Sequence, residues 1–349
     1  MTIIIFIIVL LVCVVAHEFG HFIVAKKSGM LVEEFGFGIP PRLYAKKKGE
    51  TVYSINALPI GGFVKIAGED GKAEGVPLNR QFDGKPWYIR SLVLVAGVVC
   101  NILLAFVLFT IAYTIGMPAI VTSGGTPTII TVESGSPAQK AGLNVGDTVD
   151  AIAIGSDTPS LNTEALHNAI VGSTLPIAVV YRHGGTVHTT TITPEGTGTS
   201  RHIGLEIEQV TTVHQSLWSA IKNAALQIVS LIGTIWATLA GLVGGLFHHR
   251  ANSIGLMGPV GLAHAVGDAA TIGFTYLLAF TAAISVNLAV LNIMPFPALD
   301  GGRLIVVWLE AFTGRKFSPT VVGIIHAAGF LLLIILMVVL TIGDIRKLL

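Results

Sequence analysis

Three ionisable residues interrupt an otherwise apolar run near the start of the chain. His17, Glu18 and His21 lie within residues 2–25, a stretch long enough to cross a bilayer as a helix. Positions i and i+4 share a helix face, so both imidazoles can reach one zinc ion while Glu18 addresses a water on that ion. Ionisable residues inside a span are costly and usually functional, the alternative being a polar patch buried between helices. The pattern predicts a zinc hydrolase that works within the membrane.

A catalytic zinc site usually has a third protein ligand, and Asp300 is the best candidate. It follows Pro295 and Pro297, which cannot continue a regular helix, so an apolar span has to end there. Backbone groups freed at that depth must face protein or water. An aspartate beside two glycines is otherwise typical of a simple turn. We predict that this bend brings Asp300 to the two histidines.

The composition is that of an integral membrane protein. Of 349 residues, 52% are hydrophobic and 12% are charged, whereas soluble domains average about 25% charged. Eleven of the 21 Lys and Arg lie between Lys26 and Arg90. The positive-inside rule therefore places that stretch in the cytoplasm and the N-terminus outside. The net charge is +1, and we expect a lipid bilayer around the chain and no nucleic-acid partner.

Four apolar spans are expected from length and hydropathy. They cover residues 2–25, 91–116, about 272–294 and about 321–342. Residues 225–247 are also long and apolar enough to cross, but one crossing there would leave Asp300 a bilayer away from the histidines. We therefore expect residues 215–248 to form a half-buried helix on the external side, followed by a Gly-rich connection at 253–267. Basic residues after the third span, Arg303 among them, indicate a cytoplasmic loop.

Two regions outside the spans read as β-rich. Short alternating stretches within residues 31–85 predict a β-hairpin or small sheet on the cytoplasmic side of the membrane. Thr-, Gly- and β-branched-rich sequence from about Thr122 to Val210 predicts a soluble domain. The expected fold is membrane α-helical with about four transmembrane helices, this hairpin, and an inserted extracytoplasmic α+β domain. We divide the chain into residues 1–116, 117–210, 211–270 and 271–349.

Several motifs together resemble the site-2 protease family of intramembrane zinc metalloproteases, nearly from end to end. The chain is most similar to the bacterial regulator-of-sigma-E protease branch, with one PDZ domain where some relatives carry two. The resemblance implies that domain 117–210 is PDZ-like, and that it either binds peptide ends or filters substrates by size. The motifs are His17-Glu-x-x-His21, Asn292-x-x-Pro295-x-Pro297-x-Leu-Asp300-Gly, Gly61-Gly-Phe-Val-Lys65, residues 253–261 with Gly258-Pro259-Val-Gly261, and residues 136–147.

The resemblance also implies roles for single residues. His17, His21 and Asp300 match the ligands of one zinc ion, and Glu18 matches the general base that activates its water. Asn292 matches a residue that positions substrate; from the residues alone, a helix–helix hydrogen bond is the alternative. Pro295 and Pro297 belong to the same substrate-binding segment.

A protease inside the membrane must hold its substrate extended, because a peptide bond within a helix is not open to hydrolysis. Gly61, Gly62, Phe63 and Val64 form the natural clamp, since a strand edge can pair with an extended peptide. We therefore expect the substrates to be membrane proteins with a single transmembrane segment, such as anti-sigma factors or remnant signal peptides.

The resemblance implies a multi-pass protein of the bacterial inner membrane, with the N-terminus and the PDZ-like domain extracytoplasmic. Two other functions remain as alternatives. An inactive PDZ-bearing scaffold or chaperone would have no need of four buried ionisable groups. A metal transporter would spread polar residues along a pathway across several spans, whereas here they cluster at one depth.

Overall fold

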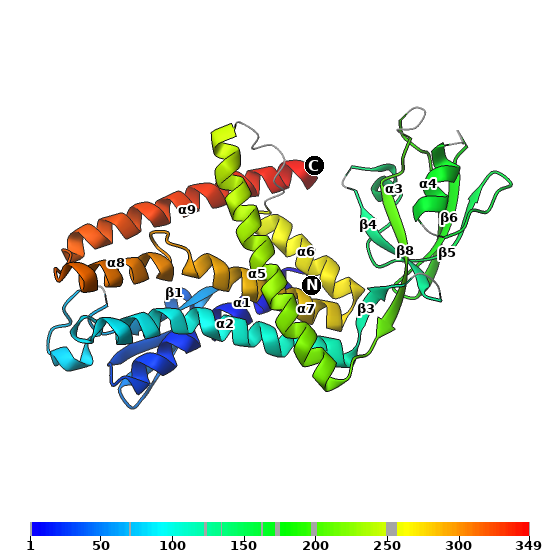
Figure 1. Ribbon diagram of the computed structural model, residues 1–349. Coiled ribbons are helices and arrows are strands. Elements are labelled where there is room, and N and C mark those ends of the chain that lie inside the picture. The colour runs from blue at the N-terminus through cyan, green and yellow to red at the C-terminus, as the bar shows by residue number, and fades with distance from the viewer. Residues whose placement is uncertain are drawn as a thin grey trace.

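A computed structural model describes residues 2–69, 71–121, 124–133, 135–161, 163–171, 175–196, 201–248 and 257–348. It shows a bundle of long helices with a β-hairpin toward one end and a separate sheet domain beyond the other (Figure 1). The elements are α1 (Thr2–Lys27), β1 (Val32–Lys48), β2 (Thr51–Ile66), η1 (Leu78–Arg80), η2 (Phe82–Gly84), α2 (Trp87–Ile115), β3 (Met117–Ile120), β4 (Thr126–Val132), α3 (Pro137–Lys140), β5 (Thr148–Ile154), α4 (Thr163–Val171), β6 (Ile177–His183), β7 (Thr186–Ile192), β8 (Leu205–Val213), α5 (Leu217–His248), α6 (Pro259–Ile272), α7 (Phe274–Ile293), α8 (Asp300–Thr313) and α9 (Pro319–Leu348).

Several of these helices are long and apolar enough to cross a membrane, as in a multi-pass membrane protein. Among the described residues, length and composition select α1, α2, Leu217–Gly241 of α5, α7 and Pro319–Arg346 of α9. In Figure 1, α5 runs steeply across the direction shared by α1, α2 and α7. Length and composition therefore do not decide whether α5 spans.

Small residues allow the central helices to pack closely. Ala105 of α2, Ala224 of α5 and Ala282 of α7 are fully buried in one apolar cluster. Helix contacts in membranes depend on such close packing, because lipid tails are as apolar as the side chains they replace. Helix α5 thus packs on α2 and α7 with one side, while Trp218 and Val229 of α5 remain exposed.

The hairpin consists of two long strands, where the sequence predicted shorter ones. Phe35 of β1 pairs with Val64 on one side and Tyr53 on the other. The first half of β1 therefore lies between the two halves of β2. In the described part of the chain, residues 62–66 of β2 pair only with β1. Ile66 packs in a cluster with residues of α1, α2 and α8, so the hairpin is fixed to the bundle.

The sheet domain spans Met117 to Val213 and has the strand order β3-β8-β4-β5-β6-β7, every neighbouring pair being antiparallel. Leu166 and Ile170 of α4 belong to its buried core. The domain is joined directly to the bundle: α2 ends at Gly116, whose φ of +120° is open to glycine, and β3 begins at the next residue.

Two helices lie where the sequence indicated connections. The predicted Gly-rich connection at 253–267 contains the start of α6, which has Pro259 in its first turn. Residues 253–256 of that connection, and His249 before it, lie outside the described residues. The predicted cytoplasmic loop after the third span begins with α8, which buries Leu304 and Val307 and ends at Gly314 in the left-handed conformation.

Several chain segments meet at the end of the bundle that carries the sheet domain. A Cβ added to Gly146, in a loop of the sheet domain, would lie 3.4 Å from Ile272 at the end of α6. Thr2 lies against Gly267 of α6. Asp344, near the end of α9, accepts a hydrogen bond from the Gly261 N–H at 2.7 Å. The beginning of α1, all of α6 and the end of α9 therefore share this end.

Candidate metal centre

His17 and His21 face the same point from one helix. Both are buried, and their Nε2 atoms are 3.1 Å apart. The helix face that carries them packs tightly on α2, because a Cβ at Gly20 would overlap the Ala96 carbonyl. The i, i+4 spacing in α1 therefore does what the sequence predicted: it presents two ring nitrogens at one depth.

The other ring nitrogen of His21 fixes its orientation. His21 Nδ1 donates to the Val93 carbonyl of α2 at 2.8 Å. A neutral imidazole that donates from Nδ1 keeps a lone pair on Nε2, the form in which histidine binds metals. Because Val93 belongs to a continuous helix, the backbone of α2 holds His21 ready for coordination.

Asp300 completes the group from the other half of the chain. It is the first residue of α8, and its Oδ2 lies 2.9 Å from His17 Nε2 and 3.2 Å from His21 Nε2. The three ligand atoms lie within 4.8 Å of one another. Asp300 Oδ2 is buried and has no hydrogen-bond partner among the described residues, although its distances to the two histidine Nε2 atoms are those of ion pairs. Three possible ligand atoms thus converge, and the carboxylate oxygen among them has no hydrogen-bond partner in that part of the chain.

These distances fit a metal ion. Tetrahedral zinc with bonds of about 2.0 Å holds its ligand atoms about 3.3 Å apart, close to the separations of the three atoms here. Gly97 of α2 keeps the adjacent space open. A Cβ on Gly97 would lie 2.5 Å from His21 Nε2 and 2.7 Å from His17 Cε1, and would displace both rings.

Glu18 lies in a cavity of about 100 Å³ with the three candidate ligands. Val64 and Ile66 of β2 line the same cavity, as does Glu69 just beyond that strand. Gly62 is so close that an added Cβ would touch Glu18 Cγ at 3.4 Å. The hairpin therefore forms one wall of the space in front of the carboxylate.

The other residues expected to bind substrate are only partly brought together. Asn292 Nδ2 lies 3.5 Å from His17 Nε2, at the edge of the metal centre. Phe63 packs against Gly36 of β1, and Gly61 faces Ile39. Pro295 is exposed, and Pro297 packs against Gly329 of α9. In this structure Val64 lines the cavity, Gly62 lies against Glu18 and Asn292 lies against His17, whereas Gly61, Phe63, Pro295 and Pro297 belong to the segments that carry them.

Two polar residues that the sequence did not assign to the site lie against it. Asn101 is fully buried in α2, with its amide nitrogen 3.5 Å from His17 Nδ1 and its Oδ1 lacking a hydrogen-bond partner. Amide oxygen and nitrogen are assigned, not observed. Rotating the amide by half a turn would give His17 Nδ1–H an acceptor and satisfy Oδ1. Asn101 lies in a mostly apolar span, and the sequence alone favoured a helix–helix hydrogen bond for it.

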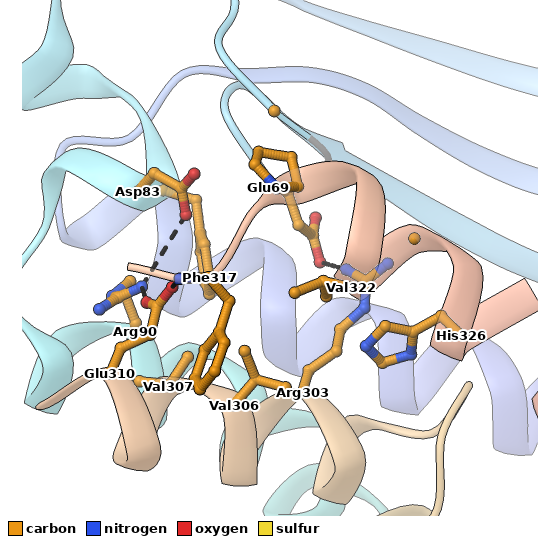
Figure 2. A pocket seen from close by; sticks show the side chains of 14 residues that line it. Glu69, Asp83, Arg90, Arg303, Val306, Val307, Glu310, Phe317, Val322 and His326 are labelled. Atoms are coloured by element: carbon orange, nitrogen blue, oxygen red, sulfur yellow. Dashed lines mark hydrogen bonds and ion pairs between the residues drawn. The ribbon is translucent and has the colours of Figure 1, made fainter. Parts of the chain in front are cut away.

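Glu69 is the second of these residues. It pairs with Arg303, one turn after Asp300 on α8 (Figure 2). Its carboxylate therefore ties the segment after β2 to the helix that carries the third candidate ligand. A glutamate in a polar, Gly-rich connection gives no local sign of such a role in the sequence.

The chain is similar to known metalloproteases over nearly its whole length. The family model described as Peptidase family M50 matches residues 5–336. A Clostridium acetobutylicum protein named "Putative zinc metalloprotease" is 34% identical over 334 residues, which cover 96% of this chain and 94% of that protein. Zinc metalloprotease RasP of Geobacillus kaustophilus is 30% identical, with 99% and 98% covered. Regulator of sigma-W protease RasP of Bacillus subtilis is 27% identical, with 99% of each chain covered.

Proposed function

This chain belongs to peptidase family M50, the site-2 protease family of zinc metalloproteases, and we propose that it cleaves peptide bonds within the membrane at the centre formed by His17, His21 and Asp300. One observation carries the proposal. Two histidines of α1 and an aspartate of α8 bring three possible ligand atoms within 4.8 Å of one another, and the buried Asp300 Oδ2 has no hydrogen-bond partner within the described ranges. Such a donor set fits one zinc ion and leaves a coordination position free for substrate or water.

Glu18 is the proposed general base. When bound, zinc would polarise the scissile carbonyl and lower the pKa of a water molecule. Glu18 adjoins His17 in sequence and shares its cavity, so its carboxylate is placed to accept the proton of the attacking water and pass it to the leaving amine. Asn292 lies beside His17 and can donate its amide hydrogens to a substrate carbonyl.

The open edge of β2 is the proposed substrate clamp. Residues 62–66 pair with β1 on one side, while Gly62 and Val64 face the cavity. A transmembrane segment that unwinds there would gain backbone hydrogen bonds to the strand in place of its helical ones. This supports substrates with one transmembrane segment, since a lone helix can leave its partners and unwind. Anti-sigma factors and remnant signal peptides are proposed as such substrates.

The contacts at one end of the bundle support the proposed topology. The sheet domain, the beginning of α1 and the end of α6 lie together there. The chain thus leaves this end in α5 and is back at it in α6, which supports a topology with no net crossing between the sheet domain and α6. With the basic residues after α1 in the cytoplasm, this end faces outward. We propose a multi-pass protein of the bacterial inner membrane, with its N-terminus and its PDZ-like domain, residues 117–210, extracytoplasmic.

The proposal is tested by separating zinc binding from cleavage in the full-length, detergent-solubilised protein. Glu18→Gln should retain zinc and lose cleavage of a single-span substrate by at least about 100-fold, because it removes a proton acceptor and no ligand. His21→Ala and Asp300→Ala should lose both zinc and cleavage. Full cleavage by Glu18→Gln would exclude the mechanism. Full zinc occupancy in Asp300→Ala at buffered zinc concentrations would exclude this ligand set.

A further inference from the structure

The segment that delivers Asp300 is held in an unusual backbone conformation. Ala298 has a φ of +79°, and it is the one non-glycine residue with positive φ in the described part of the chain. For an L-residue with a Cβ this region is sterically unfavourable, so neighbouring structure has to hold it. Ala298 is two residues before Asp300, so its conformation decides where the carboxylate goes.

A histidine from another helix holds this residue. The Ala298 N–H donates to His326 Nδ1 of α9 at 2.9 Å. His326 lies beside Arg303 at the margin of a cavity between α8 and α9 (Figure 2). Since Nδ1 accepts a hydrogen bond, the neutral ring carries its proton on Nε2. In the amino-acid sequence, His326 has no partner at metal-ligand spacing.

One turn further along the same face, Gly329 brings the backbone of α9 against the segment. A Cβ at Gly329 would lie 2.6 Å from both Pro297 Cβ and the Pro297 carbonyl oxygen. Residues i and i+3 share a helix face, so His326 and Gly329 act on adjoining residues, Ala298 and Pro297. Both contacts are direct, and neither residue touches the three candidate ligands.

We propose that His326 and Gly329 are positioning residues that set the place of Asp300 opposite His17 and His21. The His326 hydrogen bond holds Ala298 in the left-handed conformation, and Gly329 permits the close approach that this bond requires. The inference rests on the proposed role of Asp300 as a metal ligand. If it is correct, α9 is part of the metal centre although it supplies no ligand.

Zinc affinity of the full-length protein, measured by chelator competition in detergent, is the test. His326→Leu should weaken zinc binding about tenfold, the size of effect known for groups that orient metal ligands. His326→Asn should stay within about twofold of wild type, because Asn Oδ1 takes the place of Nδ1 as acceptor. Unchanged affinity in His326→Leu, or an equal loss in the Leu and Asn variants, would overturn the inference.

A double variant separates positioning from general damage to α9. Glycine adopts positive φ without the Cβ strain of alanine, so Ala298→Gly should restore most of the affinity lost in His326→Leu. A loss of unspecific helix packing would not be repaired by that change. A double variant as weak as His326→Leu would therefore refute the role of the Ala298 conformation.

A matched pair on the same helix tests the close approach. Gly329→Ala should lower zinc affinity, whereas Gly323→Ala should not, because an added Cβ at Gly323 would have no neighbour within 4 Å. Equal affinities in the two variants would count against the inference. The Asp300→Ala variant separates the proposed ligand set from the proposed positioning role. If it binds zinc as wild type does, the ligand set is wrong. If it loses zinc while His326→Leu does not, only the positioning role fails.

Discussion

At the scale of single residues, Gly97 is a steric requirement of the candidate metal centre. Its missing side chain leaves room for both imidazoles, since a Cβ would lie 2.5 Å from His21 Nε2. The neighbouring helix face is equally close, with Gly20 on Ala96. The backbones of α1 and α2 are therefore already in close contact beside the two rings.

Gly97→Ala should lower zinc affinity about 10- to 100-fold, as is usual when groups that orient metal ligands are disturbed. Gly233→Ala in α5 is the matched control, because nothing lies within 4 Å of its added Cβ and alanine is the better helix former. Chelator competition on both purified variants is the measurement. Equal zinc affinities in the two variants would show that the two imidazole rings can shift to accommodate a Cβ at position 97.

The sequence revealed those site residues whose signal is local. His17, Glu18 and His21 stand out by helical spacing in an apolar run, and Asp300 by the two prolines before it. Asn101 and His326 lie in mostly apolar helices, and their partners lie far along the chain. No periodicity or spacing can indicate a hydrogen bond between such distant positions.

At the scale of elements, the hairpin was the hardest part to read. Its strands are long because the first half of β1 pairs on both sides, and that pairing is non-local. The apolar runs of α1, α2, α7 and α9 were visible, since length and hydropathy suffice for them. The helices α6 and α8 were not, because glycines next to Pro259 and Asp300 are typical of turns.

The approach of β2 to α1 gives a graded prediction. Gly62 has an ordinary φ, and a Cβ there would lie 3.1 Å from the Gly36 carbonyl oxygen, 3.4 Å from Glu18 and 3.5 Å from Val14, so that neighbours need to shift by only a few tenths of an ångström. Gly62→Ala should therefore keep most of the cleavage rate. Gly62→Leu should lower it at least about tenfold by displacing substrate from Glu18, while zinc remains bound.

Cleavage of a single-span substrate and zinc content should be measured on the same preparations. Equal cleavage by the Ala and Leu variants would mean that substrate does not pass between β2 and α1. A loss of zinc in Gly62→Leu would instead show that the strand helps to hold the metal centre itself.

At the scale of the whole molecule, α5 decides the topology. It is apolar enough to span, yet His214 before it and α6, the next described helix, lie at the end of the bundle that carries the sheet domain. In a chain whose Cys13 and Cys100 are replaced, cysteines at His214 and Met257 should both react with an impermeant reagent applied to intact spheroplasts. A cysteine at Lys316 should react only after permeabilisation.

External labelling at His214 together with internal labelling at Met257 would mean that α5 crosses the membrane. The proposed topology would then be wrong, and the route by which Asp300 reaches the histidines would need another account. A cysteine at Gly184, in an exposed turn between β6 and β7, reports the side of the sheet domain independently.

The distance along the chain between the two halves of the metal centre has a consequence for biosynthesis. His17 and His21 enter the membrane with the first helix, whereas Asp300 follows only after the sheet domain and three further helices have been made. His326, which holds the Asp300 segment, is translated later still. With the proposed ligand set, a ribosome must therefore translate past Asp300 before a peptide bond can be cut. During insertion, the nascent chain and its neighbours at the translocon are safe from an enzyme whose last essential part is not yet synthesised.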